Sequence, residues 1–167
     1  MNKKIIIALS IIAIVVIIGL LYLNAENKMD SDMPYINSNI NSANSQYNQA
    51  VTSINNYNVT SAQNNCSAAF NSYNTSHKYA EDAYHIAHNR NDSILEEYMT
   101  LTIAEIEIKM NATRQLDEGI KIFNTSRTEA VKHFTNANNI MRDAKIYSDK
   151  RKEIELQHPE KFIKLNK

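Results

Sequence analysis

The chain has 167 residues and carries 18 basic and 18 acidic side chains, so its formal net charge is zero. This balance gives no reason to expect nucleic-acid binding, which needs clustered lysines and arginines to neutralise phosphates. Two glycines and two prolines are too few for a many-stranded sheet or a glycine-rich phosphate loop. A single cysteine excludes an intramolecular disulfide and a zinc site made of several thiolates. We therefore expect an all-α protein.

An apolar segment near the N-terminus is the first predicted element. Residues 5–23 contain no charged side chain, and only Ser10, Gly19 and Tyr22 depart from plain aliphatic character. A helix of this length is about 28 Å long, enough to cross a hydrocarbon core of roughly 30 Å. A cleaved signal peptide is the competing interpretation, but Leu23 stands where a small-x-small cleavage site needs a small residue. The pattern favours a retained transmembrane helix over residues 5–23.

The charges on either side of this segment predict its orientation. Lys3 and Lys4 precede it, whereas three of the four charged residues between positions 26 and 32 are acidic. Positive charge stays on the cytoplasmic side of a membrane. We therefore expect residues 1–4 to form a cytoplasmic N-terminus and residues 24–34 to form a linker. Everything after the segment is expected to lie outside the cytoplasm, attached to the cell membrane by a single-pass signal-anchor.

The stretch from residue 33 to residue 76 has an unusual composition. None of its 44 residues is Asp, Glu, Lys or Arg, and 26 are Asn, Gln, Ser or Thr. Such bias is typical of a disordered polar tether. Its apolar residues favour a helix instead, because they are separated alternately by four and three residues, as at the buried seam of a coiled coil. These residues are Ile36, Ile40, Ala43, Tyr47, Ala50, Ile54 and Tyr57.

The same alternation of four and three recurs later in the chain, over residues 66–87 and 120–144. Between these two stripes, residues 95–112 carry a wider apolar face, which is typical of the most buried helix of a bundle. Asn-rich breaks separate the stripes, and Ser93 and Ser126 each begin a capping box. The sequence therefore predicts four long helices, at residues 35–56, 59–89, 93–123 and 126–157.

We expect these helices to form an antiparallel bundle over residues 35–157. A long two-helix coiled-coil hairpin is the alternative, because the last stripe keeps its phase straight through Asn124. Residues 106–110 also alternate as a strand does, but good helix formers flank them and no partner strand is evident. We expect residues 158–167 to form a frayed C-terminal tail, the alternative being contact with the outer membrane leaflet.

Four side chains of the second predicted helix, His77, Glu81, His85 and His88, form a candidate metal site. Steps of four, four and three residues place neighbouring members on one helical face, where imidazoles and a carboxylate can share a transition metal. The alternative is a single packed histidine with solvated neighbours, because His77 falls on the apolar seam and the other two histidines flank it. A ferritin-like site is not indicated, because the first predicted helix has no carboxylate.

Other polar side chains give weaker indications. Cys66 lies on a seam and is expected to be buried, an intermolecular disulfide being the alternative. The acidic pair Glu105 and Glu107 diverges around a helix, so we interpret both residues as solvated. Asn-x-Ser/Thr sequences outside the membrane segment are candidate glycosylation sites, and three of them coincide with predicted helix breaks. They are Asn58, Asn65, Asn74, Asn91, Asn111 and Asn124.

No set of side chains resembles a supported acid, base and nucleophile, so we expect neither enzymatic activity nor a cofactor. The layout is similar to the helical ectodomains of bacterial and archaeal sensory receptors, which carry in addition a second span and a cytoplasmic signalling part. We predict a membrane-anchored extracytoplasmic protein that acts as an interaction or structural module of the cell envelope, with a protein partner or a second copy of itself. The alternative is a ligand- or metal-binding sensory-type ectodomain that signals through a separate partner.

Overall fold

In a computed structural model, the described backbone runs from Lys3 to Phe162, and the described side chains are those of Lys28, Met29 and residues 31–162. Within these residues the regular structure is entirely helical, so the all-α prediction is confirmed. The helices are α1 (Lys3–Asn55), α2 (Val59–Asn89), α3 (Ser93–Ile122), α4 (Arg127–Asp143), α5 (Lys145–Gln157) and α6 (Pro159–Phe162).

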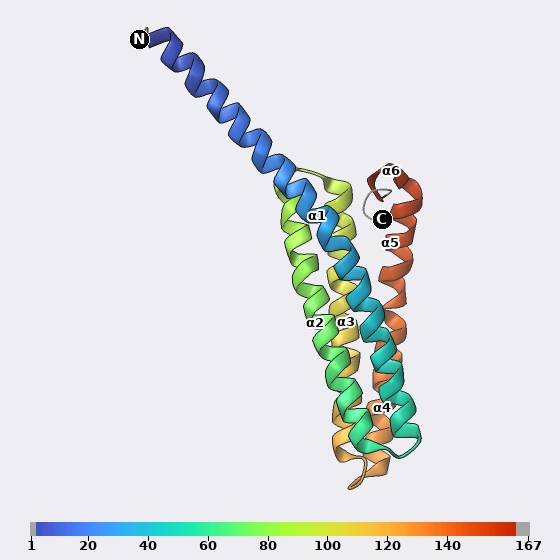
Figure 1. The fold of residues 1–167 in the computed structure, drawn as a ribbon. Helices are drawn as coiled ribbons and strands as arrows, with labels where there is room; N and C mark the ends of the chain where they lie inside the picture. Colours follow the sequence, from blue (N-terminus) through green and yellow to red (C-terminus); the bar gives the residue numbers. More distant parts are fainter. Residues whose placement is uncertain (1–2, 163–167) are drawn as a thin grey trace.

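The helices form an antiparallel bundle of four columns, in which α4 and α5 together make the fourth column (Figure 1). α1 packs along α2, α2 packs along α3, and α3 packs against both α4 and α5. Because the chain turns back at residues 56–58, 90–92 and 123–126, the two-helix alternative is wrong. We call the end that holds loop 90–92 and α6 the proximal end. The end that holds the other two loops is the distal end.

α1 has 53 residues and continues beyond the proximal end of the 31-residue α2 (Figure 1). Residues 24–34, which we expected to form a linker, belong to this helix instead. Met29 and Met33, each only 1% exposed, extend the alternation of four and three backwards from Ile36 and pack in the core. The buried seam of α1 therefore begins earlier than predicted.

The predicted anchor, residues 5–23, lies outside the residues whose side chains the structure describes. Across the part of the chain that is described, none of the helices combines the length and the apolar character needed to cross a bilayer.

Pro34 lies inside α1 without ending the helix. Proline has no amide hydrogen, so the carbonyl group of residue 30 loses the donor that a helix would otherwise supply. Met33 and Ile36 on either side are both buried against neighbouring helices, which holds the helix together at this position. The interruption of the hydrogen-bond ladder thus lies within the first two turns of the packed part of α1, which begins at Met29.

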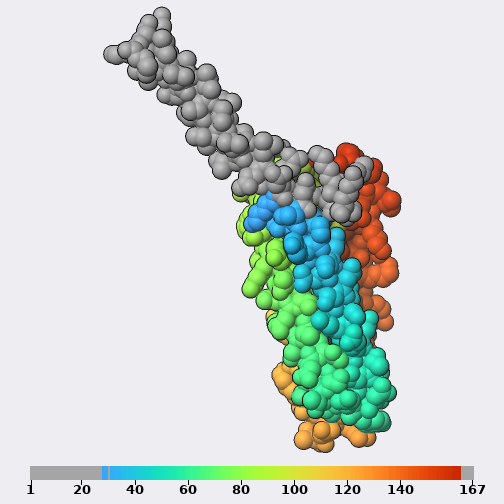
Figure 2. Space-filling model, in the orientation of Figure 1, coloured from blue at the N-terminus to red at the C-terminus, as the bar shows by residue number. Residues whose placement is uncertain are grey.

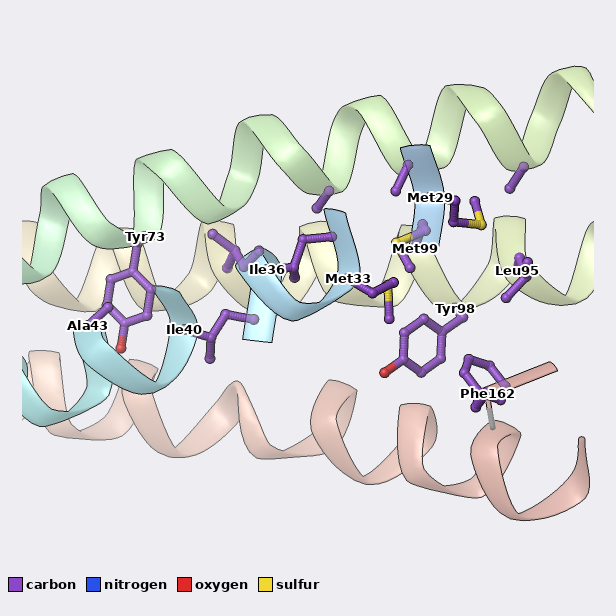
Figure 3. Close-up of a cluster of buried hydrophobic side chains, with 14 of the residues drawn as sticks. Met29, Met33, Ile36, Ile40, Ala43, Tyr73, Leu95, Tyr98, Met99 and Phe162 are labelled. Atoms are coloured by element: carbon purple, nitrogen blue, oxygen red, sulfur yellow. The ribbon is translucent and has the colours of Figure 1, made fainter. Parts of the chain in front are cut away.

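Two hydrophobic clusters fill the bundle, one toward each end. In the proximal cluster, Met29 and Met33 of α1 lie near Tyr98 of α3 and Phe162 of α6 (Figure 3). Fully buried alanines occupy the seams of all four columns, so the helices approach one another closely. They include Ala43, Ala50, Ala62, Ala69, Ala80, Ala87, Ala112, Ala130, Ala137 and Ala144.

Polar side chains begin two of the helices. The side chain of Asn58 accepts a hydrogen bond from the amide of Ser61 at 3.0 Å and caps α2. α3 is capped by Asp92, whose carboxylate accepts from the amide of Leu95, and not by Ser93 as predicted. Ser126 does stand at the N-cap of α4, but its side chain makes no capping hydrogen bond.

The last predicted helix, residues 126–157, is interrupted by a single residue. α4 ends at Asp143 and α5 begins at Lys145, on either side of Ala144. The amide of Ala144 still donates to the carbonyl of Ile140, so the chain continues in nearly the same direction. The two helices therefore act as one column with an irregular turn in its middle.

The expectation of a frayed tail is wrong for residues 158–162. Phe162 of α6 is 3% exposed, and its ring centroid lies 4.7 Å from that of Tyr98 (Figure 3). Beside it, the ammonium group of Lys161 lies 2.6 Å from the carboxylate of Asp92, the residue that caps α3. Burial of an aromatic ring outweighs the entropy of the free chain end. Residues 163–167 lie outside the described part of the chain.

Candidate functional site

A polar cleft lies in the middle of the bundle, between α1 on one side and the α4–α5 column on the other. α3 packs directly on α4 and α5, whereas α1 contacts that column little. The resulting opening has a volume of about 390 Å³. Side chains from all four columns line it: Asn44, Tyr47 and Asn48 of α1, Tyr73 of α2, Glu105 and Lys109 of α3, Met141 of α4, and Lys145 and Ser148 of α5. We call this opening the central cleft.

The floor of the central cleft contains a buried carboxylate, that of Glu105, which is 2% exposed. Its Oε2 atom accepts from Arg151 Nη2 at 2.6 Å and from Arg151 Nε at 3.1 Å. Its other oxygen, Oε1, lies 2.6 Å from Lys109 Nζ. Two cations therefore neutralise one buried anion, as burial of a charge requires. Our interpretation of Glu105 as a solvated residue is wrong.

The arginine of this group also joins the cleft to the proximal core. Arg151 Nη1 donates to the hydroxyl of Tyr98 at 3.2 Å, and that hydroxyl donates in turn to Glu155. The guanidinium also lies over the ring of Tyr98, 5.3 Å from its centroid. Burial raises the pKa of Tyr98, so the phenol keeps its proton and can act as a donor. The network thus ties α5 to α3 through both charge and ring contacts.

Two tyrosines form the opposite wall of the central cleft. The hydroxyl of Tyr73 donates to Asn44 Oδ1 at 2.7 Å. The hydroxyl of Tyr47 is buried and has no hydrogen-bond partner among the described residues. Burial raises the pKa of Tyr47 to about 12, so this hydroxyl remains protonated at neutral pH. A buried donor without a partner lowers the stability of the folded protein by about 1–3 kcal/mol. The unpaired hydroxyl of Tyr47 is therefore an unusual feature of the cleft wall.

A second candidate region is a surface and not a cavity. The stretch without charged residues, 33–76, folds as the bundled part of α1 and most of α2, and these two helices lie side by side on one face of the molecule (Figure 2). Asn, Gln, Ser and Thr side chains cover its exposed positions. We call this surface the uncharged face. The acidic and basic side chains of the described bundle lie elsewhere: on α1 before residue 33, on the end of α2, in loop 90–92 and on α3 to α6.

At the distal end, the uncharged face ends in an exposed aromatic side chain. Tyr57 is 67% exposed and has a φ of 59°, a left-handed conformation that a tyrosine rarely adopts. The guanidinium of Arg127 lies 5.2 Å from the centroid of its ring and 5.3 Å from that of Phe123. The ring of Phe123 also packs against that of Tyr57, with the centroids 5.9 Å apart, and both contacts hold the tyrosine ring in place. The exposed part of the ring remains available for contact.

The structure does not gather the four residues of the predicted metal site around one point. His77 Nδ1 lies 3.3 Å from Glu81, and His77 Nε2 lies 3.4 Å from Glu107 of α3. Because the two carboxylates contact opposite edges of the imidazole ring, they do not converge on one position. No group of three or more His, Cys, Asp or Glu side chains within the described residues is placed to hold a metal ion.

The other two histidines of that set have separate surroundings. His88 Nδ1 lies 3.1 Å from the carboxylate of Glu96, and the His88 ring stacks on that of Tyr84. His85 is exposed and meets the edge of the same tyrosine ring. The hydroxyl of Tyr84 also donates to Glu96 at 3.3 Å. These contacts join α2 to the first turns of α3.

The candidate glycosylation sites fall in two groups. Two of the six asparagines, Asn65 and Asn74, are half-buried on α2, where a glycan has little room. The other four are exposed, three of them in or beside the loops and one on α3. These exposed residues are Asn58, Asn91, Asn124 and Asn111.

Cys66 is buried, as predicted, and its thiol donates to the carbonyl of Thr113 at 3.3 Å. Burial raises its pKa to about 12, so at neutral pH it is a thiol and not a thiolate. A buried thiol is a poor nucleophile and a poor metal ligand. An intermolecular disulfide at this position would require the bundle to open.

No protein-family model matches this chain, and neither a curated protein nor a solved structure matches it.

Proposed function

We propose that this protein is a membrane-anchored interaction module, held at the outer side of the cell membrane by residues 5–23, and that it binds its partner through the uncharged face. The composition of that face carries the proposal. It combines many Asn, Ser, Gln and Thr side chains with exposed tyrosines, and surfaces rich in Tyr, Ser and Asn are typical of protein recognition. The role does not require catalysis.

The helical continuity of α1 supports the display of this face away from the membrane. The packed part of α1, residues 29–55, is about 40 Å long at 1.5 Å per residue. Since the same helix continues from the predicted anchor into the bundle, the distal end would stand at roughly that distance from the bilayer. Tyr57, at this end, is well placed for the first contact with a partner.

Photo-crosslinking in living cells tests the proposal. The uncharged face has no lysine, so amine-reactive reagents would miss it. We would place a photo-activatable amino acid at position 57 and, as a control, at position 156. Leu156 is the matched control, since it is 82% exposed but lies on α5. We expect a crosslinked product from position 57 and none from position 156. Equal crosslinking from both positions would contradict the proposal.

Two substitutions measure how much Tyr57 contributes to partner binding. Tyr57→Asn preserves the fold, because asparagine tolerates the left-handed conformation. We expect it to weaken partner binding about tenfold or more, as for an exposed tyrosine at the centre of an interface. Leu156→Asn makes a comparable change on α5, and we expect unchanged binding. Because the uncharged face has no charges, binding should also be nearly independent of salt concentration.

The membrane attachment needs a separate test. Protease added to intact cells, or to spheroplasts if an outer layer shields the protein, should digest the bundle and leave the anchor in the membrane fraction. A chain that is protected until the cells are lysed would overturn the proposed topology.

The central cleft favours a second function. In this function the protein is a ligand-binding sensory-type ectodomain that signals through a separate partner. The cleft is lined by all four columns, so an occupant would contact α1 and α5 at once. Because α1 is continuous with the predicted anchor, a change in its position would be passed on toward the membrane. A thermal shift on adding small molecules, measured on the full chain in detergent, tests this function.

A further inference from the structure

The charged groups of the central cleft have unused hydrogen-bonding capacity mainly as donors. Glu105 is the one carboxylate in its lining, and both of its oxygens already accept from cations. Lys109 and Lys145 each have further N–H groups, since an ammonium group carries three. Ser148 supplies a hydroxyl donor, and Tyr47 supplies another that has no partner among the described residues. Among the charged groups of the lining, the unused capacity is therefore mainly that of donors, while the amides of Asn44 and Asn48 supply both donors and acceptors.

The charges of the lining lead to the same conclusion. Lys109 and Lys145 contribute two positive charges, and Glu105 contributes one negative charge, so the lining carries a net charge of +1. Two groups just outside the lining cancel each other, because Arg151 stands behind Glu105 and Asp149 pairs with Lys145, so the net charge stays at +1. A small anion entering the cleft would meet an overall positive potential.

The size and the walls of the central cleft restrict the class of molecule that it could bind. Its volume of about 390 Å³ lies near the lower end of the range for small-molecule sites, about 300–1,000 Å³. Met141 and the ring of Tyr47 provide apolar surface beside the polar groups. An occupant with a short carbon skeleton and a carboxylate at one end would match both parts of the lining.

We propose that the central cleft binds a small organic carboxylate, whose oxygens accept hydrogen bonds from Lys109, Lys145 and the hydroxyl of Tyr47. This inference rests on the second proposed function and names its ligand class. The occupant would connect α1 to α5, two helices that otherwise contact each other little.

Calorimetric titration of the full chain in detergent tests the proposal with three probes of similar size. They are succinate, inorganic phosphate and butylamine. We expect saturable binding of succinate and at least tenfold weaker binding of the amine. Tighter binding of butylamine would overturn the carboxylate assignment and leave the ligand-binding function standing. Tighter binding of phosphate would also overturn it. A concentration of about 10 mM reveals even millimolar affinity. If no probe binds at that concentration, both the carboxylate assignment and the ligand-binding function are overturned.

Two variants show whether the binding occurs in the cleft. Lys145→Gln removes one cation, and Lys132→Gln is the matched control, because Lys132 lies on the same column and forms a comparably exposed pair with Glu129. We expect the first substitution to weaken succinate binding about three- to tenfold, in line with the loss of a charge-assisted hydrogen bond. The control should bind as the original chain does. Equal loss in both variants would mean binding to surface charge and would overturn the proposal.

Tyr47→Phe provides a readout that a purely structural role would not give. The hydroxyl of Tyr47 has no partner to lose among the residues that the structure describes, so the unfolding temperature without added ligand should stay the same or rise. Succinate binding should nevertheless weaken several-fold. Unchanged succinate binding in this variant would remove Tyr47 from the proposed site.

Discussion

The guanidinium group of Arg151 on α5 reaches the carboxylate of Glu105 on α3 through two hydrogen bonds, 46 residues apart in the chain. The two side chains are 11% and 2% exposed, so the pair is almost fully removed from water. Lys109 and Tyr98 complete its hydrogen bonding. A buried pair of this kind fixes which part of α5 lies beside which part of α3.

Arg151→Met should be strongly destabilising. It leaves the buried Glu105 with Lys109 as its one remaining cation, and removal of one partner of a buried pair typically costs about 3–5 kcal/mol. Combining it with Glu105→Met should recover much of that loss, because no uncompensated charge then remains. Urea denaturation followed by circular dichroism measures both. A loss below about 1 kcal/mol in the single variant would show that the pair is not buried in solution.

Asp32→Asn should stabilise the bundle at neutral pH. Asp32 is 5% exposed, and its Oδ2 atom has no hydrogen-bond partner among the described residues. Burial raises its pKa above the usual 3.8, although Lys28 opposes the shift. The folded state therefore binds a proton more readily than the unfolded state, so stability falls as the pH rises through the folded pKa.

The advantage of Asp32→Asn should accordingly be about 1 kcal/mol at pH 7, the scale of an unsatisfied buried acceptor. It should vanish near pH 3, where Asp32 is protonated in both states. Thermal unfolding at the two pH values measures the difference. An equal effect at both would mean that the charge of Asp32 is not its cause.

Gly119→Ala should destabilise the packing of α3 on α4, although alanine is the better helix former. A Cβ atom at this position would lie 2.4 Å from Phe134 Cε1 and 3.1 Å from the carbonyl oxygen of Ala130. The clash should cost about 1–3 kcal/mol, more than the gain of roughly 1 kcal/mol in helix propensity. Adding Phe134→Leu should relieve part of it. Simple additivity of the two substitutions in urea denaturation would contradict this account.

Phe162→Ala should loosen the proximal end. The ring packs on Tyr98 in the proximal cluster, and loss of a buried phenylalanine costs about 3 kcal/mol or more. Hydrogen exchange should become faster in α6 and in the first turns of α3, and stay unchanged at the distal end. Uniformly faster exchange would show that α6 supports the whole bundle.

The helices were predictable because burial leaves a local signature. Each column buries one narrow seam, so apolar residues recur at alternating steps of four and three, even in the Asn-rich stretch where composition alone suggested disorder. The same spacing extends further toward the N-terminus than we predicted, because Met29 and Met33 continue the seam of α1 into the expected linker. The docking of Phe162 was not predictable in this way, because a single aromatic residue after a helix has no periodicity.

The central cleft was not predicted, for a different reason. We judged Glu105 by its neighbour Glu107, but its environment depends on a residue 46 positions away. A signal was available, since the last seam continues from Ala137 through Met141 and Ala144 in steps of four and three to Arg151. A buried arginine on a seam requires an acidic partner on a facing helix. Tyr47, by contrast, has the spacing of an ordinary core residue, and its unpaired hydroxyl cannot be inferred from the sequence.

The missing amide at Pro34 determines where α1 can bend. Kinks in long helices concentrate at proline, where one rung of the ladder is absent. Here that point lies near the start of the packed part of α1, five residues after the buried side chain of Met29. A bend at this point would change the direction of the N-terminal part of α1, while the part of the helix that follows Pro34 keeps its contacts along α2.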